Sequence, residues 1–369
     1  MNFKKTLLGL GVSALVLGAT AAQADIKIAL AGPVTGPVAQ YGDMQFTGAK
    51  MAIEQINKAG GVNGEKLVGV VYDDACDPKQ ATAVANKVVN DGVQLVLGHL
   101  CSSSTEPASD IYEDEGILMI TAASTSPSIT EKGYQLIFRT IGLDSLQGPF
   151  AANYIISDIK PLRVAVIHDK QQYGEGLATS VKGELDKAGI NVVMFEGVTS
   201  GDKDFSALIG KMKKEKIDFV YYGGYHPELG LILRQSSEKG FDAKFMGPEG
   251  VGNPDITAIA GEASEGLLVT LPDSFEKDPK NAELVEAFKA NNEDPSGAFV
   301  FPSYSAIQIM ADSIKAVGSV DTMKMAEHMR ANTFATPTGD LAFDAKGDLK
   351  KFQFVVYNWH KDGTKSAVK

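Results

Sequence analysis

Hydroxyl side chains follow two apolar segments in the first half of the chain. "VQLVLGHLCSSST" (93–105) ends in four consecutive hydroxyl residues that begin with Ser102, and "TAASTSPS" (121–128) contains Ser124 and Thr125. A helical pattern starts at Ser102, and the first turn of a helix has unpaired N–H groups and a partial positive charge that favour an anion. Capping of the helix would need only one of these serines. Since neither segment contains Lys or Arg, we expect the two to bind a single carboxylate rather than a phosphate.

An acidic residue lies in an unusual setting in the second half. Glu249 stands between Pro and Gly in "FMGPEGVGN", after a short apolar run, whereas an exposed turn glutamate would be the commoner interpretation. A carboxylate there can form charge-assisted hydrogen bonds with an ammonium group. Together with the carboxylate site of the first half, Glu249 predicts an α-amino acid as ligand.

Aromatic residues near the ends of expected strands could surround the side chain of such a ligand. Tyr173 follows "RVAVIH" and Tyr225 follows "IDFVYYG", while Tyr41 lies in "GPVAQYGDM" and Phe299 in "PSGAFVFPSY". Each alone is more commonly an ordinary core residue.

Catalytic and metal-binding patterns are weak. The five histidines have no second His or Cys at ligand spacing. His99 and Ser102 could form a Ser–His pair, but G-x-S-x-G is missing around them, and no P-loop is present. We therefore expect no enzyme, no cofactor and no metal site, with a secreted serine hydrolase as the alternative.

The first 24 residues have the features of an export signal. Two lysines precede a short apolar stretch, and Ala22-Gln23-Ala24 forms an A-x-A cleavage site. The stretch is too short for a membrane anchor, so we expect cleavage after Ala24. Export favours a disulfide between the only two cysteines, Cys76 and Cys101.

Charge and length narrow the class of protein further. Removing residues 1–24, which contain two lysines and no acid, changes the formal charge from −11 to −13. A nucleic-acid partner or an anionic membrane surface would require a basic face. The remaining chain is long for one core, so two domains are expected.

Short apolar runs rich in Val and Ile alternate with helical segments along most of the chain. This pattern predicts an α/β protein with two Rossmann-like, doubly wound lobes, whose ligands bind beyond the carboxyl ends of the strands. We expect an N-terminal lobe of residues 25–143 plus 273–350 and a C-terminal lobe of 144–272 plus 351–369, with linkers at 142–149, 271–274 and 344–351. The expected strands are 26–31, 67–73, 93–98, 117–121, 163–168, 190–195, 217–222, 266–270 and 352–360, and the expected helices include 43–58, 78–91, 145–158, 173–188 and 228–238.

Long segments of the chain resemble the periplasmic leucine/isoleucine/valine-binding proteins, the branched-chain amino-acid-binding components of ABC importers with the type I periplasmic-binding-protein fold. The resemblance covers nearly the whole chain after residue 24. It implies two lobes joined by three crossovers, a ligand cleft between them, closure of the lobes on the ligand and delivery to a membrane permease. The segments that carry it include "GPVAQYGD", "YDDACDPKQA", "GHLCSSST", "IYEDEGILMI", "HDKQQYGEGLA", "DFVYYGGY" and "FMGPEGVGN".

The resemblance also implies roles for individual residues. Ser102 and Thr125, with backbone amides near Ala123 and Ser124, would bind the carboxylate of the ligand. Glu249, helped by Tyr225, would bind its ammonium group. The aliphatic pocket would be lined by Tyr41, Leu100, Cys101, Tyr173, Tyr225 and Phe299.

Two departures from the family pattern affect these roles. "TAASTSP" is more polar than the Ser-Pro-Gly-Ala-Thr version, and His226 replaces a second Tyr. Tyr41 stands where leucine-restricted relatives tend to have Trp, so the resemblance favours acceptance of leucine, isoleucine and valine together. We also expect the protein to be monomeric and periplasmic. An extracytoplasmic sensor of a small amide or another amino acid is the alternative on the same fold.

Overall fold

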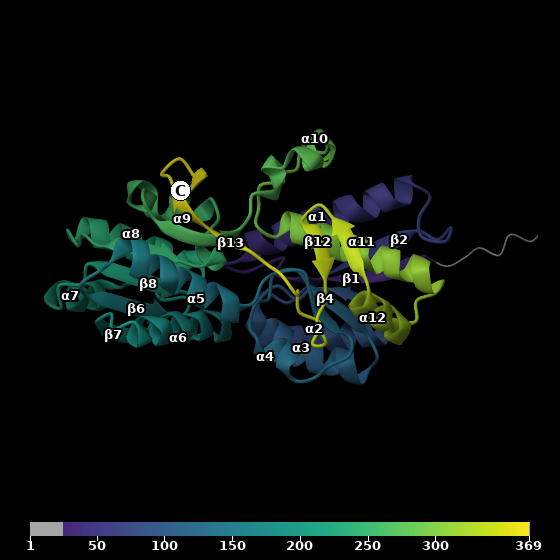
Figure 1. Cartoon of the computed structure of the whole chain (residues 1–369), viewed down its shortest axis with the longest axis horizontal. Coiled ribbons are helices and arrows are strands. Elements are labelled where there is room, and N and C mark those ends of the chain that lie inside the picture. The colour runs from purple at the N-terminus through teal and green to yellow at the C-terminus, as the bar shows by residue number, and fades with distance from the viewer. Residues whose placement is uncertain (1–24, 369) are drawn as a thin grey trace, which may run out of the picture.

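The computed structural model describes residues 25–368. The expected export signal, residues 1–24, lies outside this part. Two α/β lobes lie side by side along the long axis of the molecule (Figure 1). Each lobe contains one main sheet between layers of helices, as the alternating sequence pattern predicts.

The first lobe is built on a five-stranded sheet in the order β2-β1-β3-β4-β5. All neighbouring strands are parallel. Both faces of a parallel sheet are covered by helices, which explains why its strands read as short continuous apolar runs. The strands are β1 (Ile26–Gly32), β2 (Leu67–Asp73), β3 (Leu95–Leu97), β4 (Leu118–Thr121) and β5 (Ile137–Arg139).

Helices from two distant parts of the chain cover this sheet. Residues of α1, α11 and α12 pack on one face, and residues of α2 and α3 pack on the other. A two-stranded antiparallel sheet, β11 (Thr333–Thr336) with β12 (Gly339–Ala342), extends the first of these layers. The helices of this lobe are α1 (Ala39–Lys58), α2 (Pro78–Asn90), α3 (Ser102–Asp114), α4 (Ser128–Glu131), α10 (Ala282–Ala290), α11 (Val300–Val317) and α12 (Thr322–Ala331).

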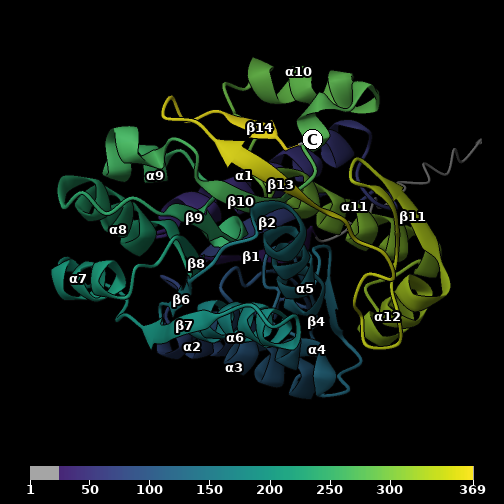
Figure 2. The same ribbon diagram turned by 60° about the vertical axis from the view of Figure 1, so that its left-hand side comes forward.

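The second lobe has a seven-stranded sheet in the order β14-β13-β10-β9-β8-β6-β7. The late strand β13 runs antiparallel to β10 (Figure 2). Helices α5 and α6 cover one face, and α7, α8 and α9 cover the other. The strands are β6 (Val164–His168), β7 (Val192–Gly197), β8 (Phe219–Gly223), β9 (Lys244–Gly247), β10 (Leu268–Pro272), β13 (Phe354–Trp359) and β14 (Lys365–Ala367), and the helices are α5 (Asp144–Tyr154), α6 (Gln172–Lys187), α7 (Ser206–Lys214), α8 (His226–Glu238) and α9 (Asp255–Ala260).

The chain passes between the two lobes three times: after β5, after β10 and after β12. The expected fold class is therefore confirmed. One expected linker is wrong in part, because α5 begins at Asp144 inside the 142–149 segment. The helix expected at 43–58 begins earlier, at Ala39. None of the helices in residues 25–368 is long and apolar enough to cross a membrane.

Candidate ligand-binding cleft

A small cavity lies where the two lobes meet. Ser102 of the first lobe and Glu249 of the second line this one cavity, which has about 220 Å³ of space unoccupied by protein atoms. Its lining residues are Leu100, Ser102, Ala123, Tyr173, Tyr225, Glu249, Gly250 and Phe299.

The first-lobe side of the cavity is the start of helix α3. The helix begins at Ser102, directly after the disulfide-bonded Cys101. A helix N-terminus has free amide donors and a partial positive charge, and therefore favours an anion. The Ser102 hydroxyl lies at this end and accepts a hydrogen bond from the Ser126 amide at 3.3 Å.

The second hydroxyl loop is held in place by its own side chains. The Ser124 hydroxyl donates to the Leu100 carbonyl at 2.8 Å and lies 2.5 Å from the Thr105 hydroxyl, so it ties the loop to the end of β3. The Thr125 side chain is buried, and its hydroxyl lies beside the Asp144 carboxylate. Ala123 lines the cavity, whereas Ser124 and Thr125 do not. Of the expected carboxylate contacts in this loop, only Ala123 lies at the cavity surface.

Arg139, which the sequence analysis did not select, supports this loop from behind. It is fully buried at the end of β5 and donates to the carbonyls of Ser124 (2.8 Å) and Ser126 (3.1 Å). Its Nε pairs with Asp348 at 2.6 Å. In the sequence, Arg139 is marked only as a basic residue after the short apolar run "LIF". Its partner Asp348 is distant in the chain, so no local pattern pairs the two residues.

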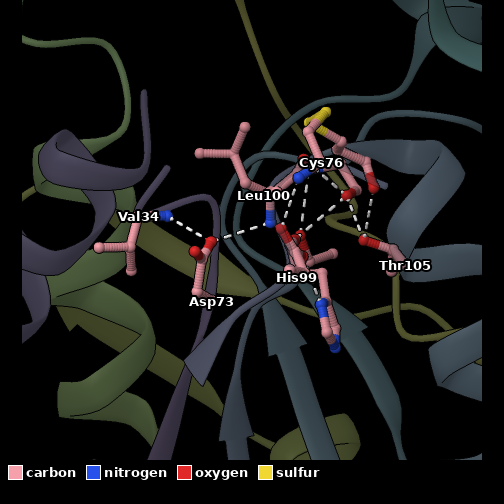
Figure 3. The surroundings of a disulfide bond; sticks show 11 residues. Val34, Asp73, Cys76, His99, Leu100 and Thr105 are labelled. Carbon is pink, nitrogen blue, oxygen red and sulfur yellow. Dashed lines mark hydrogen bonds and ion pairs between the residues drawn. A yellow bond between two sulfur atoms is a disulfide. The ribbon is translucent and has the colours of Figure 1, made fainter. Parts of the chain in front are cut away.

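Cys76 and Cys101 form a disulfide with their Cα atoms 5.6 Å apart, as expected (Figure 3). Beside it, His99 Nδ1 lies 2.6 Å from the Asp74 carboxylate and Nε2 lies 3.0 Å from the Tyr112 hydroxyl. Asp74 also accepts the Cys76 amide at 2.8 Å. Both ring nitrogens of His99 are therefore occupied by partners other than Ser102, which supports its interpretation as a structural residue.

Glu249 begins the short 3-10 turn Glu249–Val251 after β9 and is 1% exposed. Its carboxylate accepts a hydrogen bond from the Gln147 side chain. Burial raises the pKa of Glu249 to about 7, and hydrogen bonds from its own backbone, Gln147 and Tyr173 offset part of that effect. No Lys, Arg or His among the described residues forms an ion pair with it. A buried carboxylate without a cation provides a site for an ammonium group.

Asp144 and Gln147, on the first turn of α5, are a part of this region that the sequence analysis missed. Burial, followed by the negative charge of Glu249, raises the pKa of Asp144 well above its ordinary value, and Thr125 and Arg139 offset part of the rise. The segment was interpreted as a linker because "GLDSLQGP" is rich in Gly, Pro and polar residues. Its position directly after the first crossing between the lobes was the signal that could have identified it.

Aromatic rings form the remaining walls. The ring centroid of Tyr41 lies 5.6 Å from that of Phe299 and 6.2 Å from that of Tyr225, which lies 5.3 Å from that of Tyr173. The Tyr173 hydroxyl accepts the Gly250 amide at 3.1 Å. Tyr41 and Cys101 belong to the same apolar cluster as Leu100, Ala123 and Phe299 but do not line the cavity themselves.

Direct hydrogen bonds connect the lobes around the cavity. The Tyr41 hydroxyl donates to the Gly250 carbonyl at 2.8 Å. At the edge of the cleft, Gln172 of the second lobe donates to Glu106 and to Ser128 of the first lobe, both at 2.8 Å. The structure is therefore a closed arrangement of the two lobes.

His226, the second departure from the family pattern, is buried beside this region. Its ring centroid lies 5.4 Å from that of Tyr41, and its Nδ1 lies 3.1 Å from the Asn253 side-chain nitrogen. Burial lowers the pKa of His226 to about 4, against a smaller opposing effect of Asp255. The ring is therefore uncharged near neutral pH. It packs behind Tyr41 and does not line the cavity.

Two α/β lobes, three crossings of the chain and a closed cavity at their meeting point define a two-lobed binding protein. Residues 25–364 match the family model described as "Periplasmic binding protein". The chain belongs to that family, and its periplasmic location follows from this membership.

Named relatives and solved structures agree with this placement. The chain is 67% identical over 344 residues to the leucine-, isoleucine-, valine-, threonine-, and alanine-binding protein of Pseudomonas aeruginosa, covering 93% of this chain and 92% of that protein. It is 58% identical over 369 residues to the Leu/Ile/Val-binding protein of Citrobacter freundii, covering 100% of both. A branched-chain amino acid transporter substrate-binding protein of Streptococcus pneumoniae, solved with isoleucine, matches with a TM-score of 0.85 at 26% identity, covering 93% of this chain and 99% of that one.

Proposed function

We propose that this protein is the periplasmic substrate-binding component of an ABC importer and binds leucine, isoleucine and valine by closure of its two lobes. The observation that carries the proposal is that Ser102, at a helix N-terminus, and Glu249, a buried acid without a cation, line the same small cavity. These two groups are complementary to the carboxylate and the ammonium group of one α-amino acid.

In this proposal, Ser102 and backbone amides near Ala123 bind the ligand carboxylate. Glu249 binds the ammonium group, with Tyr225 nearby. Leu100, Tyr173 and Phe299 contact the aliphatic side chain, and Tyr41 and Cys101 shape that wall from behind. Ser124 and Thr125 contribute through the loop that they stabilise.

The ligand range follows from the size and polarity of the cavity together with the relatives. The Pseudomonas aeruginosa relative is named for threonine and alanine in addition to the three branched-chain amino acids. These two amino acids are therefore the first additions to any ligand panel. The apolar walls favour the branched aliphatic side chains over both.

Several further features belong to the same proposal. The signal is cleaved after Ala24, and the lobes divide at residues 143/144, 272/273 and 350/351. The protein acts as a monomer that presents its closed form to a membrane permease, and it performs no chemistry on its ligand. The arrangement of His99, which bonds to Asp74 and Tyr112, supports binding over a Ser102-dependent hydrolysis.

A thermal-shift panel of the twenty amino acids on protein stripped of bound ligand tests the proposal. A ligand at 100 times its Kd stabilises the folded state by about 2.7 kcal/mol. We expect leucine, isoleucine and valine to raise Tm. No response to any of the three would refute the proposal, and a response only to a neutral amide would favour the sensor alternative.

A further inference from the structure

Two acids that do not line the ligand cavity are buried in the second lobe, where β6 and β8 end. Asp169 directly follows β6 and is 1% exposed, and Glu228 lies in the first turn of α8 and is 3% exposed. Neither acid forms an ion pair with a Lys, Arg or His of residues 25–368. Ionised groups that leave water without a partner are costly, so these acids require a compensating group.

The hydroxyl of Tyr222, near the end of β8, lies beside Asp169. Tyr222 is fully buried, and its hydroxyl has no hydrogen-bond partner in residues 25–368. Asp169 Oδ1 accepts the Gln171 amide at 2.9 Å, whereas Oδ2 has no partner from another described residue. A Cβ atom at Gly224 would lie 2.7 Å from this Oδ2 and 2.8 Å from the Tyr222 hydroxyl, so the two unpaired oxygens lie close to the same point. Buried unpaired polar atoms are rare, and two at one place indicate a group that the protein alone does not supply.

The charges at this place leave one negative charge in excess. Glu228 is compensated, because its carboxylate accepts the Gly201 amide at 2.8 Å and lies at the N-terminal end of α8, where the helix has a partial positive charge. Burial, together with the charges of Glu228 and Glu175, raises the pKa of Asp169 to about 7. Only backbone amides offset part of this rise, and no basic residue contributes. Asp169 therefore has the uncompensated charge.

The side chains that meet here offer only oxygen atoms. Burial, followed by the charges of Asp169 and Glu228, raises the pKa of Tyr222 well above its ordinary value, so its hydroxyl stays neutral. Oxygen donors select hard cations. Calcium takes about 6–8 oxygen ligands, and residues 25–368 contain no group of three or more His, Cys, Asp or Glu side chains that could hold such an ion. One excess charge and few carboxylates match a cation of single charge instead.

We propose that Asp169, Tyr222 and Glu228 form a binding site for a monovalent alkali cation, Na⁺ or K⁺, in the second lobe. Asp169 Oδ2 and the Tyr222 hydroxyl are its direct ligands, and Glu228 contributes its charge. Gly224 leaves the necessary space, because a Cβ atom there would collide with both ligand oxygens. None of these residues lines the ligand cavity, but Gly224 is followed directly by Tyr225, which does. The site is therefore separate from the ligand cavity and next to one of its walls.

Thermal unfolding of the stripped, amino-acid-free protein in three salts of equal concentration tests the site. NaCl and KCl supply the candidate cations, and choline chloride supplies the same ionic strength with a cation too large for a buried site. A measurement at pH 8 keeps Asp169 ionised, because its pKa is about 7. A cation present at about ten times its Kd should raise Tm by roughly 2–4 °C relative to choline chloride. The difference between NaCl and KCl shows which of the two cations binds more tightly.

Asp169→Asn should abolish this dependence of Tm on the cation, because the amide keeps the shape of the side chain but has no charge. Asp204→Asn is the matched control, since Asp204 is exposed in the same lobe and accepts the Ser206 amide at 2.9 Å, as Asp169 accepts the Gln171 amide. It should keep the wild-type dependence. Tyr222→Phe removes only the unpaired hydroxyl and should reduce the dependence, so it tests the site even if Asp169→Asn does not fold.

Equal Tm values of the wild type in the three salts would show that a proton rather than a cation neutralises Asp169, and would overturn the inference. A dependence on the cation that persists undiminished in Asp169→Asn or in Tyr222→Phe would overturn it as well. No amino acid is present in these measurements, so their outcome is independent of the proposed function, which the amino-acid panel tests separately.

Discussion

The hydroxyl of Tyr41 donates a 2.8 Å hydrogen bond to the carbonyl of Gly250, across the boundary between the two lobes. Tyr41 comes from α1 of the first lobe, and Gly250 follows the acid that faces the cavity. This hydrogen bond joins the two lobes at a residue that lines the cavity, so it can form only when the cleft is closed. Side chains at this boundary can alter affinity without touching the ligand, because they stabilise only the closed form.

Tyr41→Phe should weaken leucine binding by about 2- to 12-fold, since it removes one buried hydrogen bond and keeps the ring. Calorimetry measures the change. Tyr134→Phe is the control, because its hydroxyl bonds to Asp110 at 2.7 Å within the first lobe. Equal effects of the two substitutions would contradict a role for Tyr41 in closure.

Glu249→Gln should weaken leucine binding by about 10- to 150-fold, the value of a hydrogen bond to a charged group. The amide keeps the shape of the side chain but cannot offset the charge of the ammonium group. Titration calorimetry at pH 7.5 measures the loss, and circular dichroism checks the fold. Unchanged affinity would show that the ammonium group binds elsewhere.

Ser102→Ala should raise the Kd for leucine by about 2- to 12-fold, because the α3 amides remain when one hydroxyl is lost. Ser103→Ala is the matched control, since Ser103 is the next residue of the same helix but does not line the cavity. A larger effect at position 103 would place the carboxylate on a different side of the helix.

Gln172→Ala should accelerate leucine release, because it removes the contacts with Glu106 and Ser128 that only the closed form makes. Stopped-flow fluorescence with the single tryptophan, Trp359, as the probe can follow release, since Trp359 lines a groove between residues of both lobes. The neighbouring Gln171→Ala serves as the comparison. If both variants release leucine at the wild-type rate, the Gln172 contacts do not hold the closed form together.

Replacing both Cys76 and Cys101 by Ser should lower the free energy of unfolding by about 3 kcal/mol, the value that chain entropy gives for a loop of this size. The cysteines are 25 positions apart in sequence. Urea denaturation of the ligand-free protein measures the loss. An unchanged midpoint would mean that the Asp74–His99–Tyr112 contacts alone keep this segment in place.

Much of the architecture is encoded locally. Eight of the short apolar runs chosen for their Val and Ile content overlap strands β1 to β4, β6 to β8 and β10, because buried parallel strands need apolar residues on both faces. The helix start at Ser102 and the disulfide also followed from local signals. The three-residue strand β5 and the small sheet of β11 and β12 were missed, since such short segments have no measurable period.

The sequence by itself determined the types of group at the cleft: hydroxyls at a helix start, an acid at a strand end and aromatic rings. Tertiary structure alone decided which of them meet. It left Ser124 and Thr125 out of the cavity lining, brought Arg139 beside Asp348, and placed Asp144 near Glu249. The physical reason is that burial and charge balance depend on residues that are distant in the chain, and only the packing of two lobes brings those residues into contact.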